Sequence, residues 1–265
     1  MKKTIIALLA LAGVAGATEG VPHIWTPATD VTAAVDKLGA SVSITSNAGQ
    51  LGSSRENYVI QAGDKTNDGT VSITGTPTVG DNGSFTTGTD GTKIELTSLY
   101  DFNAGDVTIT FTANVAEGAV GNILTFGEDA NWSYSFNVND SGESSFFTKN
   151  GYTTQFSAAV NNPVTLIGEH DYVLSWATKS DFGVAGGGRV LTLFVDGVRV
   201  METSEFTQDY GQAYNTDYVF GGTTGGNVTF SNVTFHRGSI IVPEPATATL
   251  SLLALAGLAA RRRRK

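Results

Sequence analysis

Hydrophobic and polar residues alternate along much of the chain between residues 18 and 241, with a period of two rather than 3.6. The pattern is clearest in residues 107–111, 134–138, 191–195 and 228–230, which are rich in β-branched and aromatic side chains. Successive side chains of a strand point to opposite faces, so this period predicts strands with one buried face. Apart from a helical turn or two near residues 33–38, the sequence predicts an all-β fold.

Dipeptides that accept positive φ angles separate the predicted strands. Glycine, aspartate and asparagine suit the left-handed backbone of two-residue hairpin turns. Many short strands joined by tight turns are typical of a β-sandwich or barrel, and the lack of a fixed-period repeat in the sequence argues against a propeller or solenoid. The turn dipeptides are Asp68-Gly69, Asp90-Gly91, Ser141-Gly142, Asn150-Gly151 and Asp196-Gly197.

Residues 18–91 contain more Gly, Thr, Ser, Asp and Asn, and fewer large apolar residues, than the segment that follows. Alternation persists at residues 42–45, 58–60 and 71–74. We therefore interpret this part as outer strands of the same fold, with a separate module as the alternative.

The first 17 residues have the organisation of a signal peptide. Lys2 and Lys3 form a basic start, residues 5–14 are apolar, and the small residues Ala15 and Ala17 provide a cleavage site. The apolar run is about half as long as a membrane span requires. The sequence therefore predicts an exported protein that begins at residue 18.

The C-terminus combines three parts in order. Pro243, Glu244 and Pro245 end any regular structure, residues 246–260 are apolar, and residues 261–265 are all cationic. The order resembles the PEP-CTERM sorting signal of bacterial surface proteins, which implies that an exosortase, a membrane-embedded transpeptidase, removes the tail. Because a stable span needs about 20 apolar residues, we expect residues 246–260 to enter the membrane only temporarily. An ordinary tail anchor is the alternative.

Removal of both ends makes the protein strongly acidic. Residues 18–245 keep all 25 acidic residues but only 9 of the 16 cations, a formal charge of −16. Such a surface repels phosphate backbones and anionic lipids, so we expect no nucleic-acid partner. The chain has no cysteine, and its stability must come from core burial or bound ions.

From Lys93 onward, the order of segments resembles a laminin-G-like, concanavalin A-like jelly roll. The resemblance rests on residues 106–111, 121–127, 170–176 and 191–200, the last pair with its Val-Asp-Gly hairpin being the most specific. It implies an antiparallel β-sandwich of about 150 residues. Such motifs indicate a fold and not an activity.

The sequence contains no recognisable catalytic motif. Residues Glu169, His170 and Asp171 lack the third acid of the glycoside hydrolases on this fold and are interpreted as a polar start to a core strand. Glu128 and Asp129 would face opposite sides of a strand, so we interpret them as loop charges. No Gly-x-Ser-x-Gly elbow occurs, and the three histidines lack zinc-ligand spacing. We expect the protein not to be an enzyme.

Structural calcium is the one cofactor that the composition suggests, since hard oxygen ligands are plentiful. Asp129 and Asp181 are the candidate ligands, on turns that could meet at a rim of the sandwich. The segment from Asp64 imitates the start of a calcium loop but has Gly75 at its twelfth position, which favours a plain turn.

An aromatic and polar segment at residues 206–218 is the candidate glycan site. Tyrosine rings stack on sugars while amides bind hydroxyl groups. The alternative interpretation is that these tyrosines cover the end of the core. Trp176 is predicted to be core, and Trp132 to begin a strand. The candidate ligand-binding residues are Tyr210, Gln212, Tyr214, Asn215 and Tyr218.

The sequence thus predicts a signal peptide (1–17), a jelly-roll domain (18–241) and a sorting signal (242–265). We expect an exported, non-catalytic protein of the cell surface or extracellular matrix that binds carbohydrate, such as an exopolysaccharide, or a surface partner. A glycoside-processing enzyme on the same fold and a purely structural matrix subunit remain alternatives.

Overall fold

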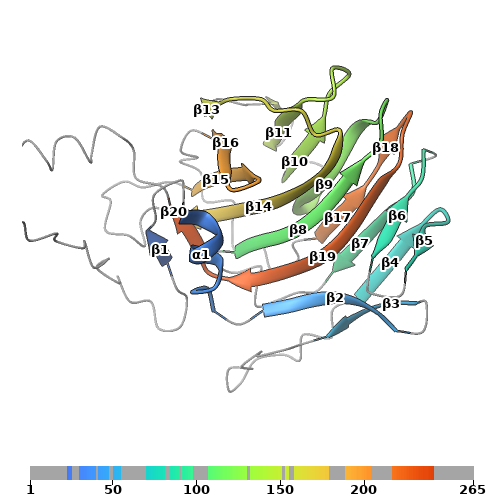
Figure 1. Ribbon diagram of the computed structural model, residues 1–265, viewed down its shortest axis with the longest axis horizontal. Helices are drawn as coiled ribbons and strands as arrows, with labels where there is room; N and C mark the ends of the chain where they lie inside the picture. Colours follow the sequence, from blue (N-terminus) through green and yellow to red (C-terminus); the bar gives the residue numbers. More distant parts are fainter. Residues whose placement is uncertain are drawn as a thin grey trace, which may run out of the picture.

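A computed structural model shows how the chain folds. It describes residues 23–25, 30–39, 41–47, 50–54, 70–80, 84–89, 91–97, 107–129, 132–150, 153–154, 158–178, 189–203 and 217–241. Within these residues nearly all regular structure is β-strand, and two large antiparallel sheets face each other (Figure 1). The predicted all-β sandwich is therefore confirmed.

One sheet has eight strands within the described part of the chain. Neighbouring strands run antiparallel, and β18 pairs with β9 beside the main path. The order across the sheet is β12 (Thr153–Thr154), β11 (Ser144–Asn150), β10 (Trp132–Val138), β9 (Val120–Asp129), β17 (Asp217–Gly221), β7 (Lys93–Thr97) and β4 (Thr70–Thr74), with β18 at Thr223–Thr224.

The other sheet has ten strands among the described residues, and two of them lie off the main path: β6 pairs with β19, and β5 pairs with β6. The order is β13 (Ala158–Asn161), β16 (Val198–Thr203), β15 (Arg189–Val195), β14 (Gly168–Thr178), β8 (Val107–Val115), β19 (Val228–Arg237), β2 (Ser41–Asn47) and β3 (Gln50–Ser54), with β5 at Thr78–Val79 and β6 at Phe85–Thr87. Strands from the N-terminal third of the chain thus occur in both sheets.

Aromatic side chains fill the space between the sheets. Tyr172 of β14 stacks on Phe111 of β8, with ring centroids 4.8 Å apart, and meets Phe136 of the other sheet at 5.6 Å. Phe220 of β17 crosses in the same way to Phe111, at 6.0 Å. Edge-to-face and offset ring contacts contribute beyond the area they bury. This aromatic layer joins the two sheets.

The predicted alternation is visible in the burial of β8. Ile109, Phe111 and Ala113 face the core and are at most 3% exposed, while Thr112 and Asn114 face outwards. Trp132 begins β10, as predicted, and Trp176 packs partly buried against the core.

Two predicted turns are confirmed by their backbone angles. Gly142 has φ +75°, and the Asp196-Gly197 turn has φ +50° and +76°, the two positive values of a type I′ hairpin. Gly91 also has a positive φ, of +79°. Asp68, Gly69, Asp90 and Gly151 lie outside the described residues, as does the predicted strand at residues 58–60.

Part of the outer face of the ten-stranded sheet is covered by the two ends of the domain. Helix α1 (Val31–Val35) forms near the predicted helical turn, slightly earlier in the chain. Strand β1 (His23–Trp25) pairs in parallel with β20 (Ser239–Ile241), with Ile24 opposite Ile240. Val31, Ala34 and Ile240 pack on Phe194 as a second small core, at the left end of Figure 1.

Strand β20 ends one residue before the C-terminal signal that begins at residue 242. In the part of the chain that the structure describes, no helix is both long and apolar enough to cross a membrane. Residues 246–260, the predicted membrane segment, lie outside that part.

Replacement of Phe220 by alanine tests the aromatic layer. Phe220 is fully buried, so the cavity should lower the free energy of unfolding by about 3–5 kcal/mol. The exposed Val198 is the control, because Val198→Ala should change stability by no more than about 0.5 kcal/mol. Urea unfolding measures both, and equal effects of the two substitutions would contradict the assignment of Phe220 to the inter-sheet core.

Candidate functional site

The predicted glycan-binding segment is only partly described. Tyr210, Gln212, Tyr214 and Asn215 lie outside the described residues. Tyr218 is in β17, where it is 1% exposed and its ring meets Phe235 edge-on at 4.8 Å. Burial also raises the pKa of its hydroxyl. The prediction that Tyr218 stacks on a sugar is therefore wrong, because its ring belongs to the core.

The predicted calcium ligands are not brought together by the described structure. Glu128 and Asp129 are the last two residues of β9, so their interpretation as loop charges is wrong: the strand continues through them to pair with β10. Asp181 lies outside the described residues. Among the residues that are described, no group of three or more His, Asp or Glu side chains could hold a metal ion. Calcium binding stays a prediction.

The remaining predicted site residues concern processing of the chain. Ala15 and Ala17 of the signal peptide, and Pro243, Glu244 and Pro245 of the sorting motif, all lie outside the described residues. The last described residue before that motif is Ile241 of β20, which is 8% exposed.

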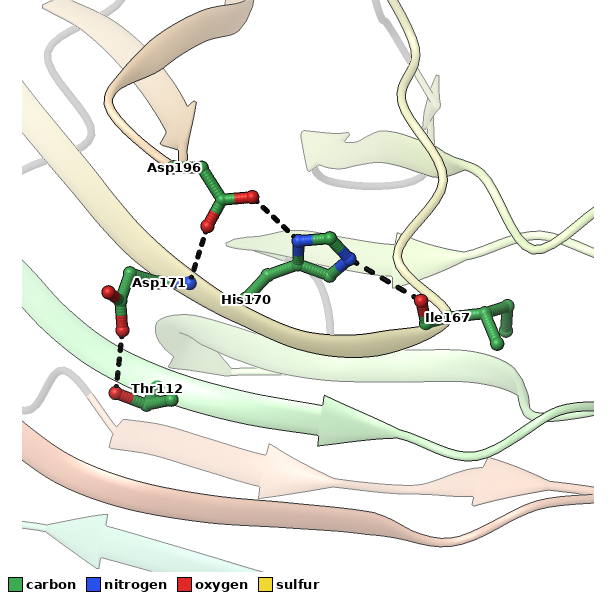
Figure 2. Close-up of polar contacts among 5 residues, drawn as sticks. All are labelled: Thr112, Ile167, His170, Asp171 and Asp196. Carbon is green, nitrogen blue, oxygen red and sulfur yellow. Dashed lines mark hydrogen bonds and ion pairs between the residues drawn. The ribbon is translucent and has the colours of Figure 1, made fainter.

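A polar network surrounds the hairpin turn between β15 and β16 (Figure 2). Asp196, the first turn residue, accepts a 3.0 Å hydrogen bond from the backbone N–H of Asp171 and one of 2.7 Å from Nδ1 of His170. In return, the backbone N–H of Asp196 donates to the carbonyl of Asp171 at 2.8 Å. The carboxylate thus fastens the turn to the neighbouring strand β14.

The electrostatics of Asp196 follow from these contacts. Its partial burial acts to raise the carboxyl pKa, but the hydrogen bond from Asp171 and the hydrogen bond and charge of His170 together lower the pKa below its ordinary value. The other ring nitrogen of His170, Nε2, faces the carbonyl of Ile167 at 3.4 Å. Both nitrogens of the ring therefore face acceptors within the fold.

A second branch of the network reaches the outer face of the ten-stranded sheet. Thr112 of β8 donates a 2.8 Å hydrogen bond to the exposed Asp171 and accepts one of 3.4 Å from Asn232 of β19. Asn232 has φ +55° at an irregularity in the pairing of β19 with β8. A carboxylate, a hydroxyl and an amide from three adjacent strands thus lie side by side, the carboxylate and the amide exposed and the hydroxyl half-buried.

Further small polar side chains continue this arrangement across the sheet. Ser43 and Thr234 share a 3.0 Å hydrogen bond between β2 and β19, and Thr86 and Thr229 share one of 2.8 Å between β6 and β19. All of these side chains are exposed or half-buried. We name this surface the polar face; it consists of Ser43, Thr86, Thr110, Thr112, Asn114, Glu169, Asp171, Thr229, Ser231 and Thr234.

Sequence reasoning did not single out the polar face, although one signal was present. Polar residues, three threonines and then Asn114, recur at every second position of residues 107–115 and alternate with buried apolar residues. That pattern marks an outward-facing polar stripe. Strand pairing decides which stripes lie side by side. The sequence pattern does not show which distant strands pair.

The fold is a two-sheet antiparallel sandwich, and comparison with known proteins adds information on its C-terminus. The C-terminal residues 242–265 match the PEP-CTERM protein-sorting motif. The chain therefore carries this motif, as predicted, and the motif implies export to the cell envelope or surface with a C-terminal membrane anchor. No curated protein matches the chain in sequence.

Solved structures similar to this chain are β-sandwich binding domains. The botulinum neurotoxin serotype C1 binding domain has a TM-score of 0.53 at 10% identity, over 78% of this chain and 50% of that chain. The binding domain of botulinum neurotoxin DC in complex with SialylT has a TM-score of 0.51 at 10% identity, over 77% and 48%. This chain thus spans about half the length of the structures it matches, and identity this low shows a shared fold alone.

The network around Asp196 predicts a pH dependence of stability. Because folding lowers the pKa of this carboxyl, its contribution is present above the ordinary pKa of 3.8 and is lost as the pH falls through the lower folded value. Asp196→Asn keeps an acceptor and a residue that tolerates positive φ but removes the charge. The urea midpoint of the variant should lie below that of the parent at pH 6 and approach it below pH 4.

The exposed Asp140 provides the control for this pH series. It lies on another turn of the sandwich, and Asp140→Asn should leave the urea midpoint close to that of the parent at each pH. A gap between the parent and Asp196→Asn that stays constant down to pH 2 would contradict the role of the charge.

Proposed function

We propose that this chain is an exported, non-catalytic protein of the cell surface or extracellular matrix that binds carbohydrate or a surface partner through its β-sandwich. The polar face carries this proposal. It presents exposed and half-buried hydroxyl, amide and carboxylate groups from adjacent strands, on a part of the sheet that α1, β1 and β20 do not cover. On a chain that the sorting motif directs to the cell envelope, such a surface is available to external partners.

The contacts of the His170–Asp196 pair favour a structural role for it over catalysis. Both carboxylate oxygens of Asp196 accept hydrogen bonds, from Asp171 and from His170, and both nitrogens of His170 face acceptors. A general base needs a free acceptor within reach of the proton that it removes. Here the same atoms hold a hairpin turn in place.

The similar solved structures support a binding function for this fold. The two named above are binding domains, and one of them is in complex with SialylT. Those proteins are longer than this chain, so a binding function of this chain is part of the proposal.

The sorting motif supplies the processing partner in this proposal. An exosortase would act near Pro243, Glu244 and Pro245 after residues 246–260 have entered the membrane, and would release the tail from the domain. Structural calcium, with Asp129 or Asp181 among its ligands, is a further element to be tested together with binding.

One observation favours a glycoside-processing enzyme as the second candidate. Glu169 and Asp171 are two residues apart on β14, so both lie on the outer face of the sheet and both are exposed. Pairs of carboxylates cleave glycosidic bonds when an acid and a base flank the sugar. Asp171, however, accepts a hydrogen bond from Thr112, which favours binding over acid catalysis.

A glycan array tests the proposed function. We expect residues 18–241 to bind at least one class of glycan, without release of reducing sugar on prolonged incubation. Repeating the array with calcium and with a chelator tests the ion, and the variants Tyr210→Ala and Tyr214→Ala test the segment at residues 206–218.

The other outcomes of the array separate the alternatives. Released reducing sugar would establish the enzyme. Failure to bind any glycan, together with concentration-dependent self-association, would overturn carbohydrate binding and leave a structural matrix subunit.

A further inference from the structure

The outer face of the ten-stranded sheet is apolar at one end and becomes polar further along its strands. At one end Val173 and Phe194 are apolar and are covered by α1 and β20. Further along the same strands, away from that end, the outward residues become hydroxyls, amides and carboxylates, and they are exposed or half-buried. The polar face is therefore the part of this sheet surface that the domain's own ends leave uncovered.

Strand pairing arranges the polar face in rows that cross the sheet. One row runs Glu169, Asn114, Thr229 and Thr86, through β14, β8, β19 and β6. The next runs Asp171, Thr112 and Ser231, and the third runs Thr110, Thr234 and Ser43. Neighbouring strands are about 4.8 Å apart, and residues two apart on a strand are about 6.8 Å apart. The result is an array of small polar groups, interrupted on β19 by the irregularity at Asn232 between the second and third rows.

Hydroxyl groups dominate this array, and each can donate one hydrogen bond and accept two. Thr86 and Thr229 share one bond, and so do Ser43 and Thr234, whose Thr234 hydroxyl also donates to the carbonyl of Asn232 at 3.5 Å. Acceptor capacity therefore remains at each pair, and the bonded hydroxyls can re-orient towards a ligand. Sugar hydroxyls have the same dual character, so the two surfaces are chemically matched.

The charge of the polar face favours neutral over anionic polysaccharides. None of its ten residues is Lys or Arg, and its two charged members, Glu169 and Asp171, are both acidic. The segment from residue 18 to 245 has a formal charge of −16. Uronate or sulfate groups would meet like charge here, whereas neutral sugars meet acceptors for their hydroxyls.

The face also determines how a ligand would be held. None of its residues is aromatic, so sugar rings gain no stacking energy on it. Single hydrogen bonds between neutral groups are individually weak, and useful affinity must come from several rows acting on one molecule. A polymer that lies across the strands and contacts more than one row satisfies this requirement, and a monosaccharide does not.

We propose that the polar face is a binding site for neutral, hydroxyl-rich polysaccharide in extended form. The inference rests on the proposed carbohydrate-binding function and assigns its site and its ligand class. The polymer lies over β14, β8 and β19, with Asn114, Thr112 and Thr229 among the contacts. Anionic polysaccharides and second copies of this chain are the competing occupants that the test separates from it.

Calorimetric titration of the full chain, purified with its own export and sorting signals in detergent, tests this proposal. The probes are the linear hexasaccharides of cellulose, laminarin, mannan and xylan, their monosaccharides, and polygalacturonate. At least one neutral hexasaccharide should bind ten or more times more tightly than its monosaccharide. The double variant Asn114→Ala/Thr229→Val should weaken that binding about tenfold, because it removes two hydrogen-bonding groups.

Thr224→Val is the matched control. Thr224 is an exposed threonine of β18 in the other sheet, and its hydroxyl donates to the carbonyl of Val120 at 3.3 Å. This variant should bind as the parent does. The melting temperature of each variant shows whether the sandwich is intact, and Asn114→Ala alone provides a single, exposed change if the double variant fails to fold.

The remaining outcomes overturn the proposal in distinguishable ways. Neutral hexasaccharide binding that is unaffected by the polar-face variants would place the site elsewhere and leave the proposed function standing. Preference for polygalacturonate would overturn the ligand class. Self-association that the variants abolish, without sugar binding, would identify a second copy as the occupant. Failure of every sugar to bind would overturn both this inference and carbohydrate binding itself.

Discussion

The contact between the two sheets through buried aromatic rings is the constraint on which the rest of the molecule depends. Phe111 and Tyr172 of one sheet meet Phe136 and Phe220 of the other, and no disulfide is available to replace these contacts, because the chain has no cysteine. Each strand that contributes a ring to this layer must turn its next residue outwards. The outward-facing polar residues of β8 and β14 are therefore a consequence of the inward-facing rings of the same strands.

The outer face is divided by the two ends of the domain. Strand β1 comes from the first described residues and β20 from the last, and with α1 they cover the apolar part of that face. The sorting motif begins immediately after β20, at residue 242. The sorting motif therefore follows the covered end, and the polar rows of β8, β14 and β19 extend towards the opposite end of the sandwich (Figure 1).

The sequence predicted the features that depend on residues close together in the chain. Period-two alternation identified β8, β10, β15 and β19, and the Asp196-Gly197 turn followed from the residues that accept positive φ. Features that depend on distant segments could not be predicted. Tyr218 looks like part of an exposed aromatic segment until β17 is placed between β7 and β9, and Glu128 and Asp129 look like loop charges until β10 pairs beside them. The polar face could not be predicted from the sequence for the same reason, since it is assembled from strands that are far apart in sequence.

The most direct test of this account is the crystal structure of the chain with a bound neutral oligosaccharide that it has been shown to recognise. We expect the sugar to lie across β14, β8 and β19 on the outer face, within hydrogen-bond distance of Thr112, Asn114 and Thr229. A sugar bound instead at residues 206–216, or at any site without contact to these strands, would contradict it.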